Sequence, residues 1–341
     1  ESLAWHAMAC GPGAGSRDCP AHCKYALVGA VAAADNERCP FCHIDAMTEI
    51  AILTPDPSDV SHTTLWPKVL ARLQRALDQA GITVVPTPWT AHVDDADGLR
   101  GFARVLPLLA WGYHFDHGRW LRACATWQRE GIALANPAGV LAWNSDKRYL
   151  SELAARGVAI PATTFADRLQ QDVVERLFDE TGADELIIKP AISGGAWKTV
   201  RVRRGDAVEP VDGTTMLLQP YLPTIEHEGE TSLLYFGGRL SHVVNKRPVA
   251  GEFRVQEEFG GQYRVLDDPP SGAVALAEQV LAAIDAQLLY ARIDVVPDAD
   301  GRWLLMEAEL IEPDFYLGSD PAQGAGFARA LRDALDDGVA A

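Results

Sequence analysis

Three acidic side chains near the end of the chain have a spacing that could bind a metal ion. Glu307 and Glu309 lie in the apolar run 303–310, where the alternation of an extended strand places both side chains on one face. Asp294 lies in the preceding apolar run, 291–296, and the short turn between the runs predicts that they pair and bring Asp294 opposite the glutamates. Bare carboxylates on a mostly apolar sheet are unfavourable, and a Mg²⁺ ion, which prefers oxygen ligands, would relieve their repulsion. A solvated acidic sheet face is the alternative interpretation.

Several cations accompany these acids. Arg292 shares a face with Asp294, which places a fixed positive charge beside the predicted metal. The chain has only six lysines, and a retained lysine suits a task that needs a compact ammonium group, such as phosphate binding. Lys246 and Arg254 lie close together before a Gly-Gly pair, and beside a carboxylate–metal site they favour phosphate binding over simple balance of an acidic surface.

A glycine-rich loop follows a strand that ends in a lysine. Lys189 closes the apolar run 185–189, and Ser193, Gly194 and Gly195 come soon after it. Glycine backbone can approach phosphates closely and offer N–H donors, while lysine supplies charge. Pro190 excludes a helix directly after the strand, so the pattern is not a P-loop. An ordinary turn is the alternative.

The segment after the run 216–219 could recognise adenine. Pro220 lacks an N–H, so the Pro220 carbonyl would accept from the adenine amino group while the Leu222 N–H donates to the ring. Glu230 follows at a distance that suits the ribose hydroxyls. The segment comprises Gln219, Pro220, Tyr221 and Leu222.

The elements that must position these residues form three groups. A buried strand at 50–53, a helix at 65–79 and further strands at 82–85 and 105–110, with a helix at 119–130, predict a small parallel α/β lobe. The remainder predicts helices and antiparallel strands. The helices are expected at 146–156, 274–284 and 324–335, and the strands at 185–189, 199–203, 216–219, 231–236, 240–245, 253–256, 291–296 and 303–310.

Composition limits the kinds of partner that the chain is expected to bind. The net charge of −17 disfavours nucleic acid, and no apolar run approaches the ~20 residues that cross a bilayer. Small molecules are the expected partners, the expected location is the cytoplasm, and the oligomeric state is left open, with a homodimer as one option.

Residues 1–46 differ from the rest. They contain five of the six cysteines, including the pairs Cys19/Cys23 and Cys39/Cys42, whose spacing resembles a loose zinc site. Upstream sequence or the remnant of a tag is an equal alternative, because Met47 is a natural start.

Taken in order, these segments resemble the ATP-grasp superfamily, in its glutathione-synthetase-like branch. The segment 143–150, with Lys147, is similar to the lysine-bearing helix of that family, and 251–254 with 260–261 is similar to its Gly-Glu-Phe-Arg…Gly-Gly signature. The nearest subgroup is the ligase that closes the ring in D-cycloserine biosynthesis, which carries a similar Trp-Asn-x-Asp-Lys-x-Tyr-Leu segment. One departure is Glu307-Ala308-Glu309, where most relatives carry Glu-x-Asn.

The resemblance implies an ATP-grasp fold of class α/β, with an N-terminal parallel lobe and two antiparallel α+β lobes that clasp ATP. Its expected divisions are an extension at 1–46, a substrate lobe at 47–137, a small ATP-grasp lobe at 138–222 and a large lobe at 223–341. The implied nucleotide ligands are Lys147, Lys189, Ser193, Gly194, Gly195, Gln219, Pro220, Tyr221, Leu222 and Glu230.

The implied activity joins a carboxylate to an amine through an acyl phosphate, with ATP and one or two Mg²⁺ ions. Asp294, Glu307 and Glu309 would hold the metal, and Arg292, Arg254 and Lys246 would be catalytic. An ATP-binding scaffold and a phosphotransferase of the same fold are the alternatives.

Overall fold

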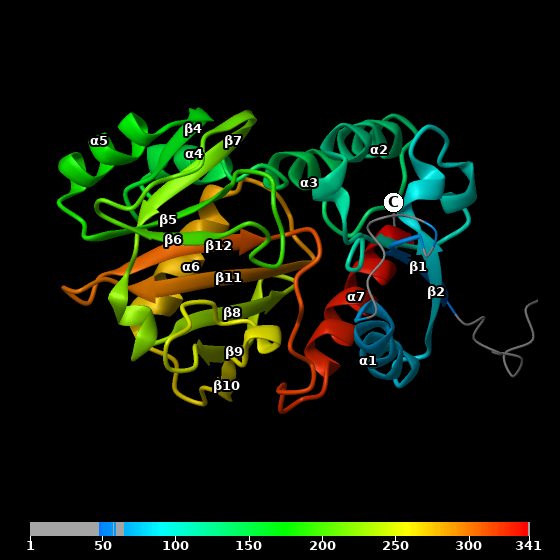
Figure 1. Ribbon diagram of the computed structural model, residues 1–341. Coiled ribbons are helices and arrows are strands. Elements are labelled where there is room, and N and C mark those ends of the chain that lie inside the picture. Colours follow the sequence, from blue (N-terminus) through cyan, green and yellow to red (C-terminus); the bar gives the residue numbers. More distant parts are fainter. Residues whose placement is uncertain (1–47, 57, 59–64, 340–341) are drawn as a thin grey trace, which may run out of the picture. The chain divides into compact units, whose positions relative to one another are not determined.

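The computed structural model describes residues 48–56, 58 and 65–339, all within a unit that begins at Met47 (Figure 1). The cysteine pairs of the proposed zinc site lie outside the described residues. Among the described residues, no helix combines the length and the apolar character that crossing a bilayer requires.

The helices and strands alternate along the chain. The helices are α1 (Trp66–Asp78), α2 (His117–Arg129), α3 (Ala138–Asn144), α4 (Tyr149–Ala155), α5 (Gln171–Thr181), α6 (Ser271–Ala283) and α7 (Ala325–Val339). The strands are β1 (Thr48–Thr54), β2 (Ile82–Pro88), β3 (Val105–Leu106), β4 (Thr164–Leu169), β5 (Glu185–Pro190), β6 (Val200–Arg203), β7 (Val211–Pro220), β8 (Glu230–Phe236), β9 (Arg239–Arg247), β10 (Gln262–Val265), β11 (Tyr290–Pro297) and β12 (Trp303–Glu309).

The first lobe is the predicted parallel α/β lobe. Its sheet has the order β2-β1-β3, with both pairs parallel, and the strand β1 is almost wholly buried. Apolar side chains of α1, among them Leu73 and Leu77, pack on one face together with Phe327 and Leu331 of α7 from the far end of the chain. On the other face the tryptophans of α2, Trp120 and Trp127, form a separate core.

Two antiparallel sheets make up the rest. The four-stranded sheet has the order β4-β7-β5-β6 and packs against α5 (Figure 1). The five-stranded sheet has the order β10-β9-β8-β11-β12, and one face of it packs against α6 and α4. The parallel lobe and the two antiparallel sheets confirm the predicted fold class.

Some expected elements differ. The expected strand at 253–256 is wrong: the ladder strand beside β9 is β10, and 253–256 forms an irregular segment between the left-handed Gly251 and Gly260. Apolar and polar residues alternate in that segment, which suggested a strand. Instead, the Arg254 side chain donates to Glu252 within the segment, and the strand that pairs with β9 is β10. The strand expected at 105–110 is confined to β3, and α3, β4 and α5 were not predicted from the sequence.

Candidate active site

The carboxylates of β11 and β12 occupy one face of the five-stranded sheet. In the register of these strands Asp294 is opposite Glu307, as the sequence predicts, and Arg292 is opposite Glu309. The alternate residues Ile293 and Ala308 belong to the core under α6. The charged residues therefore lie on the sheet face away from α6.

A β-bulge at Met306 changes which side chains share this face. Asp294 is paired with Glu307, but the next residue, Val295, is paired with Leu305, so Met306 is the extra residue. As a result Leu305 joins the core under α6, and Leu304 lies on the same face as Glu307.

Arg292 is the central cation of this face. Its guanidinium donates to both oxygens of Asp294, at 3.0–3.2 Å, and also to Glu309. Such bidentate contacts are among the stronger hydrogen bonds in proteins and fix the planes of both groups. The hydroxyl of Ser232 on β8 donates to Asp294 as well, so this carboxylate is held from two strands.

Two buried lysines hold the other acids. The Nζ of Lys147 lies 2.9 Å from Glu307 and donates to the Ser193 carbonyl at 2.7 Å, which joins the glycine-rich loop to β12. The Nζ of Lys246 lies 2.5 Å from Glu230 and 3.6 Å from Asp294. The predicted nucleotide lysines thus meet the predicted metal ligands in one cluster.

Lys189 differs from these lysines. It forms no ion pair with any residue that the structure describes. Burial lowers the pKa of its ammonium group, and the charge of Glu307 opposes that shift. Lys189 is therefore a cation that faces the acidic cluster and has no ion-pair partner in the part of the chain that the structure describes.

Burial and the neighbouring charges shift the pKa values of Asp294 and Glu309 in opposite directions. Burial alone would raise the pKa of Asp294, but Arg292 and Lys246 lower it below its ordinary value. Burial raises the pKa of Glu309 to about 7, with Arg292 opposing and Glu307 reinforcing the shift. A bound cation would stabilise the ionised form of Glu309.

The three carboxylates are of the ligand type that Mg²⁺ prefers. Asp294, Glu307 and Glu309 offer hard oxygen atoms from adjacent strands, as this ion prefers. Here each carboxylate is drawn toward a protein cation. Among the described residues their oxygens do not form a group in which all lie within 4.8 Å of one another.

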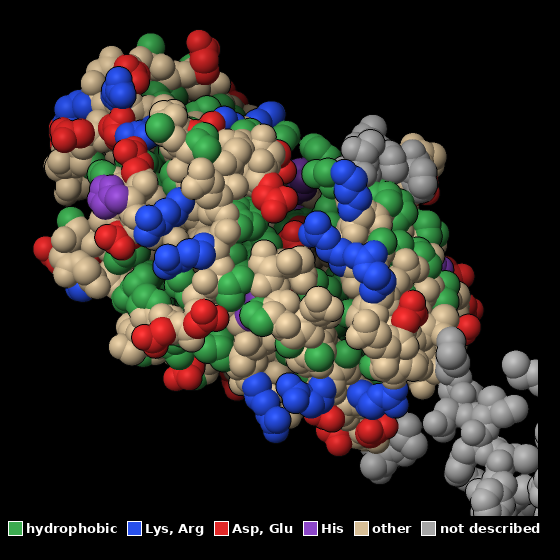
Figure 2. Space-filling model, turned by 90° about the horizontal axis from the view of Figure 1, so that it is seen from below, with side chains coloured by type: hydrophobic (Ala, Val, Ile, Leu, Met, Phe, Trp, Pro, Cys, Tyr) green, Lys and Arg blue, Asp and Glu red, His purple; other side chains and the backbone are tan. Residues whose placement is uncertain are grey.

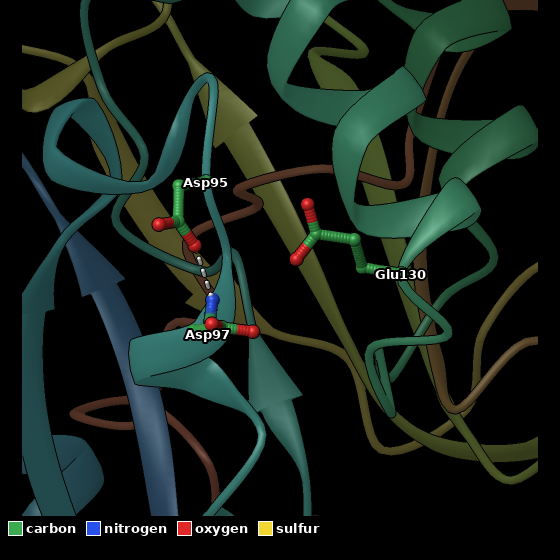
Figure 3. A group of neighbouring side chains, drawn as sticks. All are labelled: Asp95, Asp97 and Glu130. Carbon is green, nitrogen blue, oxygen red and sulfur yellow. Dashed lines mark hydrogen bonds between the residues drawn. The ribbon is translucent and has the colours of Figure 1, made fainter.

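One acidic group does have that close spacing, at the surface of the first lobe. Asp95 and Asp97 lie on the segment between β2 and β3, and Glu130 lies at the C-terminal end of α2 (Figure 3). Arg100 pairs with both Asp97 and Glu130, and the backbone N–H of Asp97 donates to Asp95. Asp95 and Asp97 are exposed and Glu130 is half-buried; protein donors satisfy all three, and we assign them no site.

The predicted adenine segment lines a cavity. The cavity has a volume of about 500 Å³, and its walls include Pro161, Pro220, Leu222 and Leu304. The bulge at Met306 is the reason that Leu304 shares a sheet face with the carboxylates. The side chain of Gln219 is buried and donates to the Thr163 hydroxyl, which anchors the adenine segment to the chain before β4.

The glycine-rich loop contacts the first lobe. Trp197 packs on His114 and Phe115, with ring centroids 5.5 Å and 5.7 Å apart. Gly195 and Ala196 have φ angles of 58° and 57°, a left-handed conformation that is costly for alanine. The sequence predicted the loop but not this aromatic contact.

Arg254 lies apart from the cluster. Its guanidinium pairs with Glu252 and lies 3.6 Å from the ring centre of Phe259. No ion pair or hydrogen bond connects its side chain to Asp294, Glu307 or Glu309 among the described residues. Its predicted role in catalysis stays a prediction.

Comparison with known proteins gives the family. The cycloserine biosynthesis protein DcsG of Streptomyces lavendulae is 33% identical over 221 residues, which cover 59% of this chain and 73% of that protein. The chain belongs to the ATP-grasp ligase superfamily. It is an ATP-dependent ligase that forms carbon–nitrogen bonds, as the sequence predicts.

Other ATP-grasp ligases are similar to it. The glutathione synthetase of Ralstonia nicotianae is 24% identical over 281 residues, covering 75% of this chain and 81% of that one. The crystal structure of D-cycloserine synthetase DcsG superposes with a TM-score of 0.69 at 26% identity, over 84% of this chain and 99% of that one. A D-alanine–D-alanine ligase of Bacillus anthracis complexed with ATP has a TM-score of 0.62 at 17% identity, over 86% and 98%. No family model matches the sequence.

Sequence reasoning did not predict the role of two buried asparagines of this ATP-grasp ligase, although Asn144 belongs to the segment 143–150 that carries the resemblance. The Asn144 amide donates to the Ala308 carbonyl and accepts from the Leu310 N–H, so it clasps the β12 backbone around Glu309. Asn136 donates to the carbonyls of Tyr290 and Leu310. The signal for Asn144 was its place in the Trp-Asn-x-Asp-Lys-x-Tyr-Leu segment, whereas Asn136 lies outside every motif that the sequence analysis identified.

Proposed function

We propose that this ligase phosphorylates the carboxylate of a small amino-acid-like substrate and then joins that carboxyl group to an amine. The observation that carries the proposal is the cluster in which Lys147, Lys189, Lys246 and Arg292 surround the carboxylates of β11 and β12. The similarity to DcsG, which is named for cycloserine in both the sequence and the structure comparison, supports a substrate of amino-acid size.

The nucleotide would lie along one face of the sheet. Adenine would enter the cavity beside Pro220 and Leu222, the ribose would meet Glu230, and the phosphates would reach Lys147, Lys189 and the loop of Ser193, Gly194 and Gly195. Lys246 lies beside both Glu230 and Asp294, so it would meet the phosphates next to the ribose.

Asp294, Glu307 and Glu309 would hold Mg²⁺, which when bound neutralises phosphate charge. A substrate carboxylate oxygen attacks the γ-phosphorus and ADP leaves. The amine nitrogen then attacks the acyl carbon, the bond to phosphate breaks, and the nitrogen loses a proton. Cations fixed before the reaction stabilise the charge that develops on the transferred group.

Each lobe has a role in this proposal. Residues 47–137 would bind the substrates, and 138–222 and 223–341 would hold the nucleotide. Trp197, packed on the first lobe, would help the loop exclude water from the acyl phosphate. The use of ATP favours a cytoplasmic location.

Lys189→Ala tests the nucleotide site. Because Lys189 has no ion pair among the described residues, its removal leaves no acidic partner stranded and the fold should survive. We expect phosphate release from ATP to fall by at least about a hundredfold, the loss typical of removing one group that stabilises a transition state. Glu209→Gln, at an exposed position in the small lobe, is the control. Turnover in Lys189→Ala equal to that of the control would refute the assignment.

A further inference from the structure

Glu312 is an acidic side chain of the active-site region that the reaction described above does not use. It follows β12 three residues after Glu309. The acids Asp294, Glu307, Glu309 and Glu230 each pair with a lysine or an arginine. By contrast, the Glu312 carboxylate has no ion pair and no hydrogen bond to another side chain among the residues that the structure describes.

His114 and Gly194 lie beside this carboxylate. A Cβ atom added at Gly194 would lie 3.7 Å from His114 Nδ1 and 3.9 Å from Glu312 Oε1. Burial, followed by the charge of Lys147, lowers the pKa of His114 to about 4, so the ring is neutral near pH 7 and cannot neutralise Glu312. The carboxylate therefore lies where the first lobe, the glycine-rich loop and the end of β12 meet.

Tyr113 shows that the same turn of the first lobe faces the acids. Burial raises the pKa of its phenol, and the negative charges of Glu312, Glu307 and Glu309 raise it further, with Glu312 the strongest of the three. The Tyr113 ring is itself buried. The described residues near Glu312 thus include a phenol and a neutral imidazole, and none of them forms an ion pair with it.

The backbone before Glu312 is held rigidly. The Leu310 N–H donates to Asn144, the Leu310 carbonyl accepts from Asn136, and the Ile311 carbonyl accepts from the Tyr290 hydroxyl at 2.8 Å. Such anchoring keeps the Glu312 side chain near the acidic cluster, as a binding group requires.

We propose that Glu312 binds the ammonium group of an amino-acid substrate, with His114 as the neutral wall of the pocket. The proposal deepens the proposed function and rests on it for the nature of the substrate. The site suits a cation that comes from outside, because Lys147, whose charge acts on Glu312, is already paired with Glu307. An ammonium group would also offset the burial of the carboxylate, since a buried charge is tolerated when it is paired.

The position favours a substrate over the nucleotide. Glu312 adjoins the side of Gly194 that faces the first lobe, whereas Gly195 adjoins Glu258 of the loop before β10. The two glycines therefore separate two carboxylates, one in the cluster and one exposed at the surface. Glu258 is the matched control for Glu312.

The experiment measures ligand binding by calorimetry to the full chain saturated with MgADP. The probes are D-alanine, D-serine, their L forms and cycloserine, with D-lactate as the match of D-alanine that carries a hydroxyl in place of the ammonium. The variants are Glu312→Gln, which removes the charge and keeps the shape, Glu312→Asp, and Glu258→Gln.

We expect at least one ammonium probe to bind the wild-type protein more tightly than D-lactate does. Glu312→Gln should weaken that probe by about tenfold or more, the value of a charge-assisted hydrogen bond, and leave MgADP binding unchanged. Glu312→Asp should restore part of the affinity, and Glu258→Gln should behave as wild type. Loss of the preference for ammonium over hydroxyl is a result that general damage to the fold would not give.

Three results would overturn the proposal. The first is that wild type and Glu312→Gln bind the ammonium probe equally well. The second is that Glu312→Gln loses MgADP binding, which would place Glu312 in the nucleotide site. The third is that wild type binds MgADP but none of the ammonium probes. If MgADP itself fails to bind wild type, the proposed function fails, while an ammonium preference that depends on Glu312 would still support this site.

Discussion

Burial gives the Glu312 carboxyl a different proton affinity in the folded and unfolded chains. Its pKa is raised to about 8, first by burial and then by the charges of Glu309 and Glu307, with Lys147 opposing. In an unfolded chain a glutamate ionises near pH ~4.3. Between these values the folded protein holds a proton that the unfolded chain has lost, so the contribution of Glu312 to stability declines as the pH rises.

Glu312→Gln should therefore flatten the pH dependence of stability in the ligand-free protein. We expect the urea midpoint of wild type to fall more than that of the variant between about pH 5 and pH 8, because glutamine does not titrate. Glu258→Gln should follow wild type. Parallel curves for wild type and Glu312→Gln would show that the Glu312 pKa is not raised in the folded protein.

At the residue scale, the sequence predicted the identities of the charged groups but not their partners. Rare lysines and the Asp294, Glu307 and Glu309 pattern pointed to a common cluster, since strand alternation is a local rule. That no described cation pairs with Glu312 depends on where the side chains of Lys147 and Arg292 point. Those directions follow from tertiary packing, which no spacing along the chain encodes.

Among the elements, α3 connects to β12 through buried amides. Asn136 is fully buried and satisfies the Leu289 N–H and the carbonyls of Tyr290 and Leu310. Replacing it with alanine would leave these backbone groups unpaired in the interior, and each such group costs about 1–3 kcal/mol. The helix thus helps hold the strands that carry the charged cluster.

Asn136→Ala should lower the free energy of unfolding by about 2–4 kcal/mol, as urea denaturation would measure. Gln279→Ala, which removes an exposed amide on α6 that donates to the Gly157 carbonyl, is the control and should change stability by less than about 0.5 kcal/mol. Similar midpoints for the two variants would mean that the Asn136 hydrogen bonds are replaceable.

Elements with a strong apolar pattern were predicted well, as β5, β8, β11 and β12 illustrate. The failures have physical reasons. β10 is short and carries Gln262 and Arg264, so its pairing with β9, and not its own composition, makes it a strand. The bulge at Met306 has no local sequence signal and depends on the pairing with β11.

For the whole molecule, two chain crossings connect the antiparallel sheets. One crossing is the predicted adenine segment after β7, and the other is the segment 156–163 between α4 and β4, where the Ala159 carbonyl accepts from the Leu305 N–H of β12. The cavity beside Leu222 lies against both. A nucleotide bound there would contact the two sheets together and reduce their separate fluctuations.

MgADP should therefore slow hydrogen exchange in peptides that cover 216–222 and 156–163. The Leu222 N–H should gain protection because adenine would accept from it. Mass spectrometry of exchange with and without MgADP measures this, and the tail helix α7 is the internal control that should not change. Protection limited to the glycine-rich loop would place the base elsewhere.

The overall architecture was predicted from the order of several motifs, each weak alone. No single segment identified the fold, whereas Lys147, Lys189, Lys246 and Asp294 in sequence order did. The −17 charge also describes the surface only on average, since the face in Figure 2 carries several separate groups of lysine and arginine among acidic side chains.

The extra residue in β12 has a consequence for how such ligases can vary. Because Met306 is the extra residue at the bulge, the leucine beside the base cavity and Glu307 share a surface although they are three positions apart in the sequence. Deleting Met306 would place them two positions apart in a regular strand, which would keep both on that surface and Leu305 in the core under α6. The bulge is therefore needed only while the extra residue is present.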